Sequence, residues 1–172
     1  GDGDKVVIAG IGQDTVTAGE GDHHVLGDHG NLIYQADGIL QQALNNGTAG
    51  DKDKITLNQN GSGNNVVIAG AGDDTVTTGN GEDYVLGDHG ELNFVNGIVT
   101  SGRSTDTTQG GNDTVNLGNG DKLVIGGFGG DTITAGNGDN RVLGDNGELL
   151  FSNGILQTID TQDTAADTGG VD

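Results

Sequence analysis

A short glycine-aspartate segment occurs three times in the chain with nearly the same letters. It reads Gly-Ile-Gly-Gln-Asp-Thr-Val-Thr at 10–17, Gly-Ala-Gly-Asp-Asp-Thr-Val-Thr at 70–77 and Gly-Phe-Gly-Gly-Asp-Thr-Ile-Thr at 127–134. Each copy places a glycine turn and an aspartate before a short strand with an apolar centre. Related segments recur between the copies about every nine residues. A fixed short period of this kind predicts one continuous solenoid, in which each coil stacks on its neighbours.

A second period of roughly sixty residues contains the first. It is carried by Val-Leu-Gly-Asp-His-Gly at 25–30 and 85–90 and by Val-Leu-Gly-Asp-Asn-Gly at 142–147. A complete unit is expected to hold four coils followed by a non-repetitive insert. The predicted units are about 1–49, 50–109 and 110–168, with 169–172 starting the next unit. The match of 169–172 to 110–113 suggests a window cut from a longer array.

Composition excludes several classes of protein. The chain has 36 glycines, no cysteine or proline, and 26 acidic against 6 basic residues, with a formal net charge of -20. Such charge repels nucleic acid and anionic lipid and attracts divalent cations. No stretch resembles a signal peptide or a membrane span. Disorder is the alternative for this composition, but the regular spacing of valine, isoleucine and glycine argues against it.

The coils resemble the RTX, or haemolysin-type, calcium-binding repeat, whose consensus is Gly-Gly-x-Gly-x-Asp-x-U-x with U a large aliphatic residue. Segments of this kind cover roughly two-thirds of the chain. The resemblance implies an all-β fold, a right-handed parallel β-roll (a β-solenoid) with two nonapeptides per turn. It also implies Ca²⁺ between glycine turns stacked on one side. Glycine permits the tightly turned backbone that lets carbonyl oxygens converge, and calcium takes six to eight oxygen ligands.

The first and third coils of each unit are expected to stack and to supply the calcium ligands. Asp113 and Asp131 are eighteen residues apart, as a shared site requires, whereas Asp53 and Asp74 are twenty-one apart. The three extra residues are Asn58-Gln59-Asn60, which should bulge at a turn. At the two ends of the chain, Asp14 and Asp172 lack a stacking partner within a unit. The candidate ligands of this series are Asp14, Asp53, Asp74, Asp113, Asp131 and Asp172.

The second and fourth coils depart from the consensus at the aspartate position. Its occupants are Lys5, His23, Asn65, Asp83, Lys122 and Asn140. These coils should bind calcium weakly or not at all, although Asp83 keeps a carboxylate and remains a candidate ligand. One hypothesis is that Lys5 and Lys122 each place an ammonium group near the vacant site, as a tethered cation. Its carboxylate neighbours would then be Asp4, Asp22, Asp121 and Asp139. The alternative is that these lysines point into solvent.

A Gly-Asp step follows the fourth coil of each unit, within 27–32, 87–92 and 144–149. It falls where a fifth coil would stack on the third. The carboxylates at this step could therefore close a second calcium site. They are Asp28, Asp88 and Asp145, with Glu91 and Glu148. The simpler alternative is a bend out of the roll with exposed carboxylates.

The inserts predict β-hairpins at about 31–44, 91–100 and 148–158. Asn96-Gly97 and Asn153-Gly154 lie between apolar strands and predict type I′ turns. The first unit has Asp37-Gly38 at the corresponding place and is expected to keep this form. Residues 100–110 and 157–169 are rich in polar side chains and predict loops that return the chain to the next coil.

Alternation of side chains along a strand predicts two apolar faces. The central residues Val16, Val25, Val76, Val85, Ile133 and Val142 should face the roll interior. The sheet formed by the second and fourth coils also has an apolar outer face, made of Val6, Ile8, Leu26, Val66, Ile68, Leu86, Leu123, Ile125 and Leu143. Such a face is not left to water. Either the hairpins fold back on it, or a neighbouring copy covers it in a homotypic assembly.

These features favour a structural segment that binds Ca²⁺ and folds on binding it. Its partners would be calcium and neighbouring repeats of the same array. The resemblance implies secretion by a type I system, so the segment is expected outside the cell or at its surface, in an adhesin stalk, surface layer or matrix filament. The alternative is a carboxy-terminal secretion and folding module of a toxin or exoenzyme.

Other functions are weaker alternatives. His23-His24 beside Asp22 could hold a transition metal, and the threonine rows could bind ice or a polysaccharide surface. An enzyme is not expected, because no Ser/His/Asp arrangement repeats and calcium accounts for the carboxylates.

Overall fold

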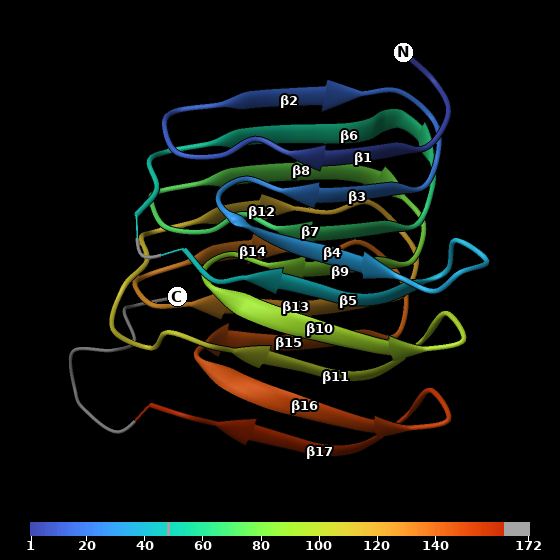
Figure 1. The fold of residues 1–172 in the computed structure, drawn as a ribbon. Coiled ribbons are helices and arrows are strands. Elements are labelled where there is room, and N and C mark those ends of the chain that lie inside the picture. Colours follow the sequence, from blue (N-terminus) through green and yellow to red (C-terminus); the bar gives the residue numbers. More distant parts are fainter. Residues whose placement is uncertain (48, 164–172) are drawn as a thin grey trace.

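The computed structural model describes residues 1–47 and 49–163. Its regular elements are all β-strands, and they form three sheets stacked in layers (Figure 1). We call these the back sheet, the middle sheet and the hairpin sheet. Among the described residues, no helix has the length and apolar character to cross a membrane.

The middle and back sheets are parallel and together form the roll. The chain alternates between them, so each pass through both sheets makes one turn of the solenoid. The middle sheet contains, in spatial order, β1 (Lys5–Ile8), β3 (His23–Leu26), β7 (Asn65–Ile68), β9 (Asp83–Leu86), β13 (Lys122–Gly127) and β15 (Asn140–Asp145). The back sheet contains β2 (Thr15–Ala18), β6 (Lys54–Ser62), β8 (Thr75–Asn80), β12 (Thr114–Asn116) and β14 (Thr132–Thr134). The predicted all-β parallel roll is confirmed.

The core between these two sheets consists of the central residues of the coils. Val25, Val76 and Val85 are fully buried and pack in one cluster. The residues on either side of each central residue in the back sheet, which are threonines except for Lys54 and Asn116, point away from this core, because side chains alternate along a strand. Val142 is 40 % exposed, since it lies on β15, the last strand of the middle sheet.

The third layer is a six-stranded antiparallel sheet built from one hairpin per unit. Its strands are β4 (Gly30–Tyr34), β5 (Leu40–Asn45), β10 (Gly90–Val95), β11 (Ile98–Ser104), β16 (Gly147–Ser152) and β17 (Ile155–Thr161). The hairpins pair with one another, β5 with β10 and β11 with β16. Leu92 and Leu149 are fully buried against the outer face of the middle sheet. The hairpins therefore cover the apolar face of their own chain.

The hairpin turns agree with the sequence in two of the three units. Asn96 and Gly97 both have positive φ (52° and 77°), as do Asn153 and Gly154 (51° and 74°), which is the type I′ conformation. The first unit also forms the expected hairpin, with β4 paired to β5, but its turn is not type I′, because Gly38 is the only residue of that turn with positive φ (89°). The strands are also longer than predicted. Residues 100–104 and 157–161 continue β11 and β17, where loops were expected, because they pair with β10 and β16 along the full length of each hairpin.

Each hairpin is inserted inside a turn of the roll. The chain leaves the middle sheet at Gly27, forms the first hairpin, and returns near Gly50 to complete the turn before β6. The Gly-Asp step before each hairpin was predicted to be a fifth coil. Together with the first coil of the next unit, which follows the hairpin, it makes one turn of the roll. The insertion at Asn58 falls at a register shift between Leu57 and Ser62 in the pairing of β6 with β8, as expected of a bulge.

Candidate metal sites

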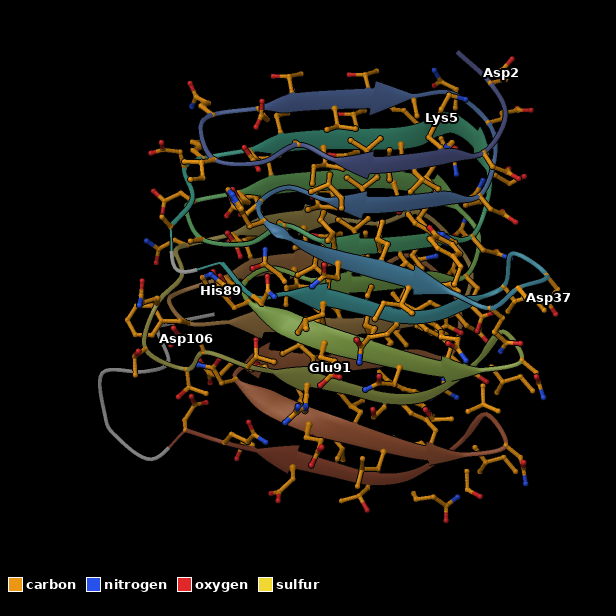
Figure 2. All side chains as sticks on the ribbon, in the orientation of Figure 1. Asp2, Lys5, Asp37, His89, Glu91 and Asp106 are labelled. Atoms are coloured by element: carbon orange, nitrogen blue, oxygen red, sulfur yellow. The ribbon has the colours of Figure 1, made fainter. Side chains whose placement is uncertain are left out.

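The roll has two edges with different chemistry. At the exit edge, the chain leaves the middle sheet for the back sheet or for a hairpin. At the far edge, it passes from the back sheet to the middle sheet. In Figure 2, His89 and Asp106 lie at the exit edge, whereas Lys5 lies at the far edge.

Five aspartates form a continuous column along the exit edge. Each precedes a back-sheet strand, and its backbone N–H donates to Oδ1 of the aspartate in the next turn. The four bonds are Asp14 to Asp53 (2.8 Å), Asp53 to Asp74 (2.7 Å), Asp74 to Asp113 (2.8 Å) and Asp113 to Asp131 (2.8 Å). The coil pattern predicts no stacking partner for Asp14 within its own unit. The structure stacks it on Asp53 because the first hairpin loops out between them.

The second oxygen of these carboxylates points into the protein. Oδ2 of Asp53, Asp74 and Asp113 is buried and has no hydrogen-bond partner. An unsatisfied buried oxygen calls for a cation or a hydrogen-bond donor at that point. The side chains of these three residues are only 1–2 % exposed, so bulk water does not solvate them.

Backbone carbonyls converge on the same points. A methyl group on Gly87 would collide with Asp113 Oδ2 and with the carbonyl oxygen of Gly126. Gly126 in turn faces Asp131 Oδ2 and the carbonyl oxygen of Gly144. Carboxylate and carbonyl oxygens brought together beside glycine match the hard oxygen ligands that calcium takes. The residues at the exit edge therefore fit the calcium implied by the repeat.

The electrostatics of the column favour a bound cation. Burial, together with the neighbouring carboxylates of Asp113 and Asp53, raises the pKa of Asp74 to about 9. Burial likewise raises the pKa of Asp113 to about 8, with Asp131 adding to the effect. The pKa of Asp53 is also raised, chiefly by burial. At neutral pH the folded column therefore needs protons or a cation, and a calcium ion would supply the positive charge.

Asp28 and Asp88, at the first two hairpin exits, are buried, which corrects the alternative of exposed carboxylates for these two; Asp145 is half-buried. Asp88 Oδ1 accepts from the N–H of Gly111 (3.0 Å), and its Oδ2 accepts from the N–H of Phe128 (2.6 Å). Asp28 Oδ2 accepts from the N–H of Ala71 (2.7 Å), while its Oδ1 is buried without a hydrogen-bond partner. Burial raises the pKa of Asp28 to about 7 and that of Asp88 to about 10. These side chains join each hairpin to the turns of the roll, and Asp28 keeps one oxygen free for a cation.

The remaining members of that predicted group lie elsewhere. Glu91 Oε2 pairs with Arg103 (2.5 Å) and Glu91 Oε1 accepts from Gln42 Nε2 (2.6 Å), within the hairpin sheet (Figure 2). Glu148 stands opposite Arg103 on the next strand. The structure thus assigns Glu91 to an ion pair, because alternation along β10 turns it to the face opposite Leu92. Asp145 ends β15, and Asp172 lies outside the described residues.

At the far edge, side chains of the protein link adjacent turns of the roll by an ion pair and hydrogen bonds. Lys122 Nζ lies 3.1 Å from Asp83 Oδ2 and donates to the carbonyl oxygens of Gly81 and Asn119, the latter at 3.2 Å. Both charged side chains are fully buried. Asp83, a predicted calcium ligand, therefore has an ammonium group beside its carboxylate, among carbonyl oxygens. Lys5 Nζ makes the corresponding contacts with the carbonyls of Asp2 and Gly3 in a more exposed position.

The carboxylates proposed as neighbours of these lysines form a separate ladder. The N–H of Asp22 donates to Asp4 Oδ1, and that of Asp139 donates to Asp121 Oδ1, both at 2.9 Å. All four side chains lie at the surface of the far-edge turns.

Sequence reasoning missed Asn58, which completes the far edge. Its side chain is buried, contacts His23 Nε2 (2.9 Å) and donates to the Gly21 carbonyl (2.9 Å). The only feature of the sequence that marks this residue is the three-residue insertion, Asn58-Gln59-Asn60, that contains it. His24 turns to the other side of β3 and contacts the Tyr34 hydroxyl (2.8 Å). The two histidines therefore do not share a metal site.

No three His, Asp or Glu side chains among the described residues form a metal site by themselves. A calcium ion at the exit edge would therefore need backbone carbonyls as well as carboxylates, as the geometry beside Gly87 and Gly126 allows.

Comparison with known proteins agrees with this chemistry. A family model described as RTX calcium-binding nonapeptide repeat (4 copies) matches residues 59–90 and 123–148. No curated protein and no solved structure matches the chain. The matched residues include the exit-edge turns that carry Asp74 and Asp131. The chain thus contains RTX calcium-binding nonapeptide repeats in these two segments, and repeats of this family bind calcium ions.

Proposed function

We propose that the chain is a structural segment of an extracellular repeat protein, folded by calcium and serving in an adhesin stalk, surface layer or matrix filament. The observation that carries the proposal is the exit-edge column, whose carboxylates are buried against carbonyl oxygens with few cations of the protein nearby. The net charge of -20 adds to this, because it opposes compaction until cations bind.

Calcium binding and folding would be one reaction. The calcium-free chain must bury the carboxylates of Asp53, Asp74 and Asp113 beside one another, and its small core must also offset the loss of chain entropy. Calcium removes the repulsion and fixes the turns, so its binding free energy becomes folding free energy. Extracellular modules bind calcium with dissociation constants of about 10⁻⁴ to 10⁻³ M. The chain would then stay unfolded inside a cell, as type I export requires, and fold outside it.

The hairpin sheet favours the array over a secretion module. It runs without a break across all three units and buries Leu92 and Leu149 under a layer that coils alone would lack. A module that serves only secretion and folding of a toxin or exoenzyme needs no such layer. A continuous third sheet stiffens a rod, which suits a stalk or filament. The proposal includes no catalytic role.

Small-angle X-ray scattering across a calcium titration tests this proposal. A chain of this length should have a radius of gyration of about 44 Å when unfolded and about 16 Å when compact. We expect the transition between roughly 0.1 and 1 mM calcium. Compaction already complete at micromolar calcium would contradict folding after export, and an expanded chain at 10 mM would contradict calcium-driven folding.

A further inference from the structure

Asp83 stands at the far edge in the geometry of the exit-edge column. Its Oδ1 accepts the N–H of Asn65 in the neighbouring turn (3.2 Å), just as the exit-edge aspartates accept theirs. Its side chain is also fully buried, and the difference lies at Oδ2. In Asp113 that oxygen has no hydrogen-bond partner. In Asp83 it accepts from Thr78 Oγ1 (2.8 Å) and lies 3.1 Å from Lys122 Nζ. The ammonium group therefore lies where the exit edge leaves a carboxylate oxygen open to a cation.

The ammonium group also binds carbonyl oxygens of the glycine turns. Lys122 Nζ donates to the carbonyl of Asn119 in its own turn (3.2 Å) and to that of Gly81 in the adjacent turn. At the exit edge, carbonyl oxygens beside a carboxylate are the groups that fit calcium. Lysine is almost never fully buried unless it is paired, yet the side chain of Lys122 is completely buried. The lysine thus supplies a positive charge to oxygens that would otherwise need a cation.

The corresponding position of β3 holds a histidine, His23, which is also fully buried. Its Nδ1 accepts the N–H of Lys5 (3.1 Å), as Asp83 Oδ1 accepts that of Asn65. The ring proton is therefore on Nε2, which donates to the carbonyl oxygen of Gly19 (2.9 Å). One ring nitrogen replaces the carboxylate oxygen of the column, and the other presents an N–H where a cation would bind the carbonyl oxygen.

Asparagine side chains at the far edge do the same with their amide groups. Asn65 Nδ2 donates to the carbonyl of Gly63 (3.2 Å) and to Asp83 Oδ1 (2.7 Å). Asn140 Nδ2 donates to the carbonyl of Gly136 (2.8 Å). The residue types differ along this edge, but each places an N–H donor on a carbonyl oxygen of a glycine turn. The consensus aspartate cannot do this, because an ionised carboxylate has no proton to donate.

We propose that calcium binds this roll along the exit edge only, because N–H donors of the chain itself hold the far-edge turns in its place. Lys122 is the strongest of these donors, since it brings a positive charge to the buried Asp83 carboxylate. The inference rests on the proposed function and says which of the two edges calcium controls. It extends the replacement of calcium from lysine to His23 and the asparagines. Fewer calcium ions should therefore bind than the number of nine-residue coils would suggest.

Counting the bound calcium of two far-edge variants tests this assignment. Lys122→Asp restores the consensus carboxylate, and Asn65→Asp does so while keeping the Oδ1 that accepts from Asn58 Nδ2 (3.3 Å). In equilibrium dialysis, each variant should bind one calcium ion more than the unmodified chain, with a dissociation constant of about 10⁻⁴ to 10⁻³ M. Asn119→Asp is the matched control at the same edge. The Asn119 side chain is exposed and its Oδ1 accepts the N–H of Asn137 (2.9 Å), so this variant should bind no additional ion.

An added ion in either variant, with none in the control, supports the assignment. Calcium counts equal to that of the unmodified chain in both variants would overturn it, and so would an equal gain in the control. Failure of both variants to fold at millimolar calcium would also overturn it, because a newly bound ion should offset the missing donor. Circular dichroism of the unmodified chain with and without calcium keeps the two proposals apart. Calcium-induced folding of that chain, with no added ion in the variants, refutes only the edge assignment, whereas a fold indifferent to calcium refutes the proposed function.

Discussion

Replacing Asp113 by asparagine tests the exit-edge column, because it removes the charge and keeps the shape. The amide oxygen of Asn can still accept from the N–H of Asp74, as Asp113 Oδ1 does at 2.8 Å. The amide nitrogen would take the place of Oδ2, beside the carbonyl oxygen of Gly126. A repulsive pair of oxygens thus becomes a donor and an acceptor. The substitution should therefore favour the calcium-free fold and weaken the response to calcium.

The gain in stability of the calcium-free fold follows from the pKa of Asp113, which burial raises from 3.8 to about 8. At pH 7 an unfolded aspartate is ionised, whereas the folded, calcium-free carboxyl is held mainly in its protonated form. This difference costs the folded state roughly 4 kcal/mol at pH 7. Asparagine has no such cost, so the calcium-free variant should be more stable by up to roughly 4 kcal/mol.

The effect of the substitution on the stabilisation by calcium has the opposite sign. One site with a dissociation constant of 10⁻⁴ to 10⁻³ M contributes about 1.4 to 2.7 kcal/mol at 10 mM calcium. The stabilisation that calcium gives should fall by about this amount in the variant. Urea unfolding at 10 mM calcium, and folding induced by trimethylamine N-oxide in chelator, measure the two states.

Asp121→Asn is the matched control. Asp121 Oδ1 accepts from the N–H of Asp139 in the same geometry, but its side chain is exposed at the far edge. We expect a change of about 0.5 kcal/mol or less, with or without calcium. If Asp113→Asn behaved like this control, Asp113 would not be a calcium ligand and the cation-site reasoning would be refuted.

Three further predictions address pH, the far edge and the hairpin layer. Because the pKa values of Asp74 and Asp113 are raised to about 9 and about 8, the calcium-free fold should lose stability as pH rises from about 4 to 9. When trimethylamine N-oxide holds the calcium-free chain folded at pH 7, calcium binding should correspondingly release protons, and calorimetry that gave the same heat in buffers of different ionisation enthalpy would contradict this. Lys122→Met leaves the buried Asp83 carboxylate without its ammonium partner and should cost roughly 3 to 5 kcal/mol in calcium; added Asp83→Asn should restore part of it, and urea unfolding of both variants decides. Leu92→Ala should cost about 2 to 5 kcal/mol by opening a cavity under the hairpin sheet. By contrast, Leu150→Ala, at a half-exposed position on the outer face, should cost about 1 kcal/mol or less.

The roll could be predicted from sequence because its determinants are local and periodic. The nine-residue spacing of glycine and aspartate sets the turns, and alternation sends Val25, Val76 and Val85 inside. Asn96-Gly97 and Asn153-Gly154 needed no tertiary information to specify their turns, since both residues adopt positive φ readily. Asp37-Gly38 failed because a longer loop connects β4 and β5.

The missed features depend on contacts between distant segments. The stacking of Asp14 on Asp53 is hidden by a separation of 39 residues, since an intervening hairpin obscures the eighteen-residue turn. The pairing of the hairpins into one sheet depends on contacts such as Gln42 with Glu91, 49 residues apart. Asn58 could not be assigned because a bulge residue has no periodic position. The lysine hypothesis had the right residue, Lys122, but the wrong carboxylates, since its partner Asp83 comes from an adjacent coil.

Far-ultraviolet circular dichroism with and without calcium tests the central claim most directly. The claim is that buried carboxylates at the exit edge make folding of this chain depend on calcium. We predict a spectrum of an unfolded chain in chelator at pH 7, and a β-rich spectrum at millimolar calcium that reverts when chelator is added. The same β-rich spectrum in both conditions would contradict the account.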